Sequence, residues 1–152
     1  MGCDIHLYSE TKTKNGWEIN EKCYWSYWND FSDEYHLECD YDDHIYSGSN
    51  YALFGLLAGV RSQHELEFEP MGFPRDASIQ MNRLYKQWDG DAHTPSYLTS
   101  KELLDKIKEL KENGLYDPDD DKYLVESLQK ILDGLGMIDK EGEKRIVFWF
   151  DS

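Results

Sequence analysis

Apolar and polar residues alternate over 3–10, which predicts a β-strand with one apolar face. Asn15-Gly16 then gives the signal of a type I′ turn, and 17–19 begin a return strand. A hairpin therefore opens the chain. Near the other end, 144–150 are β-branched and aromatic, so they predict the strand that completes the sheet.

Between these strands, apolar residues recur at helical spacing in four segments. The expected helices run from 51 to about 60 behind a cap at Ser49 or Asn50, from a cap at Asp76 or Ser78 to about Trp88, from the capping box Thr99-Ser100-Lys101-Glu102 to Gly114, and from Asp117-Pro118 to Gly134. Residues 62–77 and 89–96 are expected to be loops. The pattern predicts an α+β fold, in which the N-terminal hairpin and the C-terminal strand form an antiparallel sheet with three to four helices between them. The length of 152 residues predicts a single domain over 1–152.

The chain is acidic, with 31 Asp and Glu against 16 Lys and Arg and a formal net charge of −15. Nucleic acids and anionic membranes bind basic surfaces, so direct binding to either is not expected. The longest apolar run, 52–60, is about half the length of a membrane span. No secretory leader is visible, and the three cysteines (Cys3, Cys23 and Cys39) have no Cys-x-x-Cys spacing. We therefore expect reduced thiols, no zinc ribbon and a cytoplasmic protein.

One segment concentrates the acidity, because 23–60 contain no Lys or Arg. Within it, 24–46 mix acidic with aromatic side chains; the start can extend the hairpin, and the rest has no clear period and is expected to be an irregular loop. Three interpretations stay open. The segment is a solvated loop whose rings pack on the sheet, a surface for a basic partner that mimics a phosphate backbone, or a stacking platform for a sugar or base.

Two Asp-x-His motifs carry the candidate chemistry. Asp4 and His6 share one face of the first strand, with Glu10 further along that face. Asp91 and His93 lie in a segment flanked by Gly and Pro. If the two motifs are adjacent in space, they suit zinc, manganese or non-haem iron with an open position for water. Glu10 and His93 are then the candidate catalytic residues of a metal-dependent hydrolase. The simpler alternative is that these polar groups are only solvated or cap turns.

The opening Met-Gly-Cys-Asp-Ile-His-Leu-Tyr-x-Glu resembles a family of small, mostly uncharacterised proteins of bacteriophage and prophage genomes. Further blocks that resemble the family lie at 50–61, 72–78, 88–99 and 145–151. They contain the second Asp-x-His motif, and the resemblance implies one shared site in a protein that acts in the cytoplasm of an infected host.

Two functions from different classes follow, and a structural or packaging accessory without a ligand is a third alternative. The first is a phage accessory protein that acts in counter-defence. Its polar pocket binds a small nucleotide-like ligand, and it also cleaves this ligand if the protein is an enzyme. In that pocket Asn50 and Arg61 are expected to bind the ligand, and Trp88 and Tyr97 to stack on its ring. The second is a non-enzymatic acidic protein that inhibits a basic host protein, such as a nuclease, by mimicking DNA. The sequence leaves open whether the chain is an enzyme.

Overall fold

The computed structural model describes residues 2–27, 35–40, 44–48, 50–60, 67–88, 90–113 and 118–151, except for the side chains of 118–121. In chain order its elements are β1 (Asp4–Thr13), β2 (Gly16–Ile19), β3 (Cys23–Tyr27), β4 (Tyr35–Cys39), α1 (Tyr51–Ala58), α2 (Ile79–Lys86), β5 (His93–Thr99), α3 (Ser100–Glu112), α4 (Pro118–Gly136) and β6 (Lys144–Asp151). An antiparallel sheet built from strands near both ends, with helices between them, confirms the predicted α+β class.

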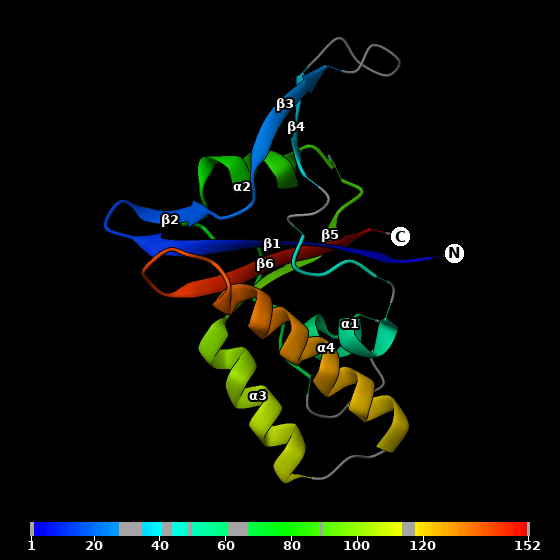
Figure 1. Cartoon of the computed structure of the whole chain (residues 1–152). Helices are drawn as coiled ribbons and strands as arrows, with labels where there is room; N and C mark the ends of the chain where they lie inside the picture. Colours follow the sequence, from blue (N-terminus) through cyan, green and yellow to red (C-terminus); the bar gives the residue numbers. More distant parts are fainter. Residues whose placement is uncertain are drawn as a thin grey trace.

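The main sheet has four antiparallel strands in the order β2-β1-β6-β5 (Figure 1). β1 pairs with β6 from Asp4 to Thr11 and with β2 through the predicted hairpin. The hairpin turn ends at Gly16, whose φ of 103° costs a glycine nothing. β6 lies between two neighbouring strands and has elements packed on both of its faces, so its residues 145–150 are all buried.

Alternate residues of β6 contribute to two hydrophobic cores. Ile146, Phe148 and Phe150 point to the face of the sheet covered by α1, α3 and α4. Val147 and Trp149 point to the opposite face, where they pack with residues of α2 and β4. Figure 1 shows these two sets of elements on either side of the main sheet. The two faces are called here the three-helix face and the α2 face.

β3 and β4 pair as a separate two-stranded sheet, called here the arm, which projects beyond α2 (Figure 1). Its register sets Trp25 opposite Leu37 and Tyr27 opposite Tyr35. Leu37 is buried in the core of the α2 face. The Gln87 amide completes the edge of β4, since it accepts from the Leu37 N–H at 2.7 Å and donates to the Leu37 carbonyl at 3.0 Å. The irregular loop expected for the later part of this segment is therefore wrong at β4, whereas β3 lies at the start, where the sequence allows an extended strand.

A strand also occupies 93–96, where the sequence pattern predicts a loop. β5 is an edge strand with a bulge between His93 and Ser96, and Thr94 has a positive φ of 51°. Pro95 lacks an N–H group and is tolerated at a bulge or at the edge of a sheet. The irregular backbone explains why the sequence shows no period of two here.

The predicted helix starts are confirmed wherever the structure describes them. Asn50 caps α1, and Ser78 caps α2. Thr99 and Glu102 form the predicted capping box of α3. At its other end α4 continues to Gly136, past the predicted stop.

Candidate functional site

The first Asp-x-His motif lies on the α2 face, at the start of β1. His6 Nε2 is 2.7 Å from Oδ2 of Asp151, and the two side chains are 22% and 24% exposed. The ring of Trp88 packs on the imidazole, with 4.2 Å between ring centroids. Asp4 lies directly across from Asp151 in the strand register. The polar partner of His6 is therefore a carboxylate on β6.

The second motif is on the other side of the sheet. His93 pairs with Phe150 and packs over its ring at 6.1 Å, whereas His6 pairs with Trp149. Because successive residues of a strand point to opposite faces, the two imidazoles point away from each other. Asp91 is exposed in the turn before β5. The structure thus does not bring the two motifs together.

No group of three or more His, Cys, Asp or Glu within the described ranges is arranged to hold a metal ion. A zinc, manganese or iron site needs at least three protein ligands. The described side chains of the two Asp-x-His motifs therefore do not form one metal site.

Glu10 is completely buried and joins three elements. Its Oε1 accepts from Arg145 Nη2 at 2.7 Å and Nε at 3.0 Å, and its Oε2 accepts from the Ser78 N–H at 2.8 Å. Arg145 also donates to Asp76 at 3.0 Å. A general base needs an oxygen within reach of the substrate. With both oxygens occupied by protein donors, Glu10 is placed to hold β1, β6 and the start of α2 together.

The predicted ligand-binding residues that the structure describes lie on or beside different elements. Asn50 Oδ1 accepts from the Leu53 N–H at 3.2 Å, so this side chain serves as the cap of α1. Tyr97 lies on the α2 face, with its ring 5.3 Å from the guanidinium carbon of Arg145. Arg61 lies outside the described residues. Among the predicted ligand-binding residues that the structure describes, Trp88 lines a pocket.

That pocket has a volume of about 470 Å³ and lies between β1, the arm and the end of α2. It is lined by Tyr8, His36, Leu37, Glu38, Cys39, His44, Leu84, Gln87 and Trp88. Burial raises the pKa of the Tyr8 phenol above its ordinary value, and negative charge on Cys39 and Glu21 raises it further. The ring of His44 packs edge-on against Tyr8, with centroids 5.6 Å apart. Sequence reasoning assigns no role to His36 and His44, because neither belongs to a motif.

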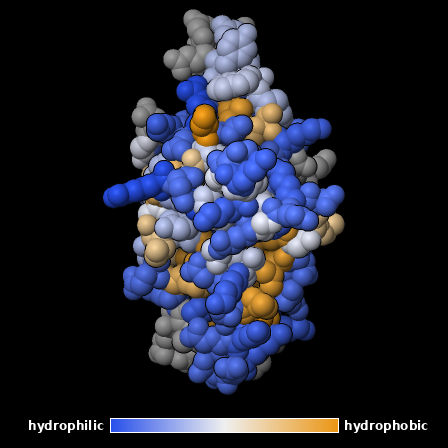
Figure 2. All heavy atoms as spheres, turned by 90° about the vertical axis from the view of Figure 1, so that its left-hand side faces the viewer, coloured by the Kyte–Doolittle hydropathy of each residue, from blue (hydrophilic) through white to orange (hydrophobic). Residues whose placement is uncertain are grey.

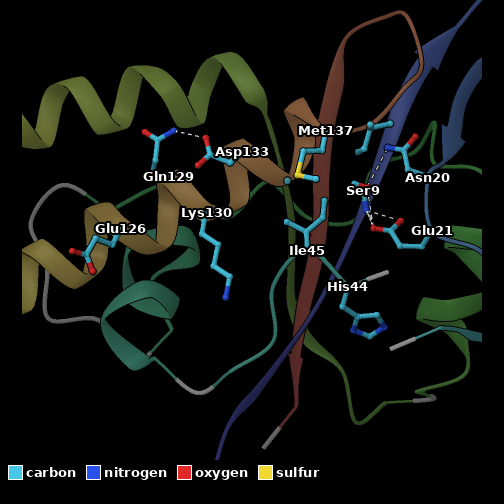
Figure 3. A pocket seen from close by; sticks show the side chains of 12 residues that line it. Ser9, Asn20, Glu21, His44, Ile45, Glu126, Gln129, Lys130, Asp133 and Met137 are labelled. Carbon is cyan, nitrogen blue, oxygen red and sulfur yellow. Dashed lines mark hydrogen bonds between the residues drawn. The ribbon is translucent and has the colours of Figure 1, made fainter. Parts of the chain in front are cut away.

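A second pocket, of about 730 Å³, separates the edge of β1 from α4 (Figure 3). The Glu21 carboxylate accepts from the Ser9 N–H at 2.7 and 3.0 Å and from Ser9 Oγ at 2.9 Å. Asn20 Nδ2 donates to the same hydroxyl at 3.1 Å. These bonds satisfy the polar groups of Ser9 at the edge of β1, just before the residues that pair with β2. This wall of the pocket therefore has a structural role. On the opposite wall, Gln129 donates to Asp133 within α4.

The arm exposes aromatic side chains to solvent. Trp25 is 57% exposed, Tyr27 46% and Tyr35 60%, and these three share the face of the arm that carries Leu37. They are called here the arm patch. The rings of Tyr27 and Tyr35 lie 5.2 Å apart. In Figure 2 the arm is the pale upper part of the molecule, where Tyr and Trp have intermediate hydropathy, above a largely hydrophilic face.

The root of the arm places two cysteines side by side. Cys23 and Cys39 are directly opposite each other in the register of β3 and β4, with their Sγ atoms 3.0 Å apart. The spacing of the cysteines along the sequence does not predict this pair, because Cys23 and Cys39 meet only through the pairing of two strands that the sequence does not reveal.

Comparison of the chain with models of protein families, with curated proteins and with solved structures finds no match. The predicted resemblance to a phage family therefore stays a prediction. Within the described ranges, every helix is too short or too polar to cross a membrane.

Proposed function

We propose that this protein is a non-enzymatic binding protein that attaches to a basic partner protein through the arm. The observation that carries the proposal is the arm patch, Trp25, Tyr27 and Tyr35, held away from the main sheet on two short strands. Exposed aromatic rings cost free energy in water, and clusters of them mark protein interfaces.

The arm is also held in place, which lowers the cost of binding. Leu37 anchors β4 in the core, and Gln87 bonds to the backbone of the same residue. Arg83 donates to the Tyr35 carbonyl at 3.1 Å and lies 5.5 Å from the ring of Trp25. A surface that is ordered before binding loses less entropy when its partner docks.

Charge indicates the kind of partner. Residues 23–60 contain no Lys or Arg, and the net charge of the chain is −15. An acidic protein accelerates its encounter with a basic one and repels acidic competitors. Inhibition of a basic host protein such as a nuclease, and a role in counter-defence during phage infection, extend this proposal and remain predictions.

The test is site-specific photo-crosslinking followed by affinity measurement. A photoreactive residue at position 35 is expected to capture a basic protein from a bacterial lysate, and one at position 123 is the control, because Tyr123 is 64% exposed on α4. With the purified partner, Trp25→Ala and Tyr35→Ala are each expected to weaken binding roughly 30-fold, as for interface hot spots. Tyr123→Ala should leave the affinity unchanged.

The salt dependence separates charge from shape. Higher ionic strength is expected to slow association, because it screens the attraction between an acidic and a basic surface. The proposal is wrong if the captured protein is acidic, or if the arm variants bind it as tightly as the wild type does. DNA is a useful competitor, since it displaces the protein only where the partner surface also binds phosphates.

A second candidate function is supported by the pocket that Trp88 lines. Its volume of about 470 Å³ falls within the usual range for small-molecule sites, roughly 300–1,000 Å³. The indole of Trp88 and the ring of Tyr8 offer aromatic surface, and His36 and His44 offer hydrogen-bonding groups. Calorimetric titration with adenosine and guanosine monophosphates tests this candidate. Saturable binding that Trp88→Ala abolishes supports a ligand site, and the absence of heat with both nucleotides argues against a nucleotide-like ligand.

A further inference from the structure

Cys23 and Cys39 occupy a position in the arm where a covalent bond between two strands is geometrically allowed. The next pair toward the root of the arm, Lys22 and Asp40, is linked by a backbone hydrogen bond from the Asp40 N–H to the Lys22 carbonyl at 3.3 Å. Hydrogen-bonded and non-hydrogen-bonded pairs alternate along antiparallel strands, so Cys23 and Cys39 are a non-hydrogen-bonded pair. Such pairs have Cα atoms about 4.5 Å apart, at the short end of the range of about 4.4–6.8 Å that a disulfide spans.

The side chains point toward each other as well. The two Sγ atoms lie 3.0 Å apart, and both residues are partly exposed. A thiol reagent can therefore approach the pair from solvent. Cys3, by contrast, is buried in the core of the three-helix face, so the chain carries its own internal control.

We propose that Cys23 and Cys39 form an oxidation site, at which the two thiols convert reversibly into an intramolecular disulfide by exchange with a small disulfide such as oxidised glutathione. This inference is independent of the proposed binding function. Disulfides that form in a reducing compartment are characteristically transient and redox-sensing. The bond closes the chain between 23 and 39 and fastens both strands of the arm at its root.

The reaction balances as two successive exchanges. The thiolate of one cysteine attacks a sulfur of oxidised glutathione and displaces one glutathione thiolate, which leaves a mixed disulfide. The second cysteine then attacks the protein sulfur of that mixed disulfide, forms the S–S bond and releases the other glutathione. The protein gives up two electrons and two protons, and the two glutathione molecules that leave as thiols receive them.

The experiment is thiol counting by mass spectrometry after incubation of the full chain with oxidised glutathione. The wild type is expected to lose two of its three thiols and retain no glutathione, and peptide mapping should join Cys23 to Cys39. Subsequent addition of reduced glutathione in excess should restore all three thiols. The Cys3→Ser variant is expected to behave as the wild type does, with one fewer thiol.

Single substitutions at the site give the matched comparison. In Cys23→Ser and in Cys39→Ser, the remaining cysteine of the pair is expected to keep one glutathione as a mixed disulfide, because no second thiol can displace it. Circular dichroism of each variant verifies that the fold is retained. The proposal fails if the wild type keeps glutathione adducts, forms disulfides between chains, uses Cys3 in the bond or does not react.

Discussion

Neutralising Glu10 tests whether this carboxylate holds the fold together or does chemistry. Both of its oxygens are occupied, by two donors of Arg145 and by the Ser78 N–H, and the side chain is completely buried. Glu10→Gln keeps the shape of the side chain, removes its charge and sets an amide against groups that only donate. The amide oxygen can replace one carboxylate oxygen, so the NH2 group faces either Arg145 or the Ser78 N–H, donor against donor. Of its two carboxylate partners, Arg145 then keeps the exposed Asp76.

The expected loss of stability is large. Removal of one partner of a buried ion pair costs about 3–5 kcal/mol, because the other charge stays buried without compensation. Domains of this length unfold at a temperature about 2–4 °C lower for each kcal/mol lost. We therefore expect the melting temperature of Glu10→Gln to fall by roughly 6–20 °C, a large effect on a total stability of about 5–15 kcal/mol.

Urea denaturation followed by tryptophan fluorescence measures the free energy, and the same substitution on an exposed pair is the control. Glu126 lies 4.0 Å from Lys122 on the surface of α4, so Glu126→Gln is expected to change stability by less than about 0.5 kcal/mol. The reasoning is refuted if Glu10→Gln unfolds at the same urea concentration as this control. If Glu10→Gln is as stable as the wild type, Glu10 again becomes a candidate general base.

Three further predictions concern the α2 face and the arm. Because the pKa of Tyr8 is raised in the folded protein, the stability present at neutral pH is expected to fall as the pH rises above the ordinary tyrosine value of about 10. Denaturation at several pH values between about 9 and 11 measures this loss of unfolding free energy. The loss should be smaller in Tyr8→Phe than in the wild type, and unchanged in Tyr123→Phe. Oxidation of Cys23 and Cys39 should raise the free energy of unfolding by about 3 kcal/mol, the value for a loop of roughly this length, and coincident urea midpoints with and without reductant would contradict it. Gln87→Ala removes two bonds to the edge of β4 and should cost about 1–3 kcal/mol; amide exchange in β4 should accelerate, and unchanged exchange would mean that Gln87 does not hold the arm.

The parts of the fold that the sequence predicts are those with strong local signals. The alternation over 3–10 and the aromatic, β-branched run over 144–150 predict β1 and β6, because both strands bury a continuous apolar face. The caps at Ser78 and Thr99 are local hydrogen bonds between a side chain and the backbone a few residues ahead. Such signals are complete within a short stretch of chain, so they need no knowledge of the rest of the molecule.

The arm lacks a signal of that kind. Of its ten residues, Leu37 is the one deeply buried apolar side chain, and the aromatic rings that share its face, those of Trp25, Tyr27 and Tyr35, are exposed. A period of two depends on a contrast between a buried and an exposed face. Since both faces of the arm are largely open to solvent, the contrast is absent, and the same openness is what makes the arm patch available to a partner.

The candidate chemistry depends on strand register, which spacing along the sequence cannot supply. The shared face of Asp4 and His6 follows from their separation by two residues, and the structure places them so. Whether His93 joins them depends on which residue of β6 it faces: opposite Trp149 it would share the face of His6, and opposite Phe150 it does not. A shift of one residue therefore decides between one site and two separate histidines. The same dependence on register brings Cys23 and Cys39 together from positions that no cysteine motif connects, so the pairing of strands creates one candidate site in this protein and removes another.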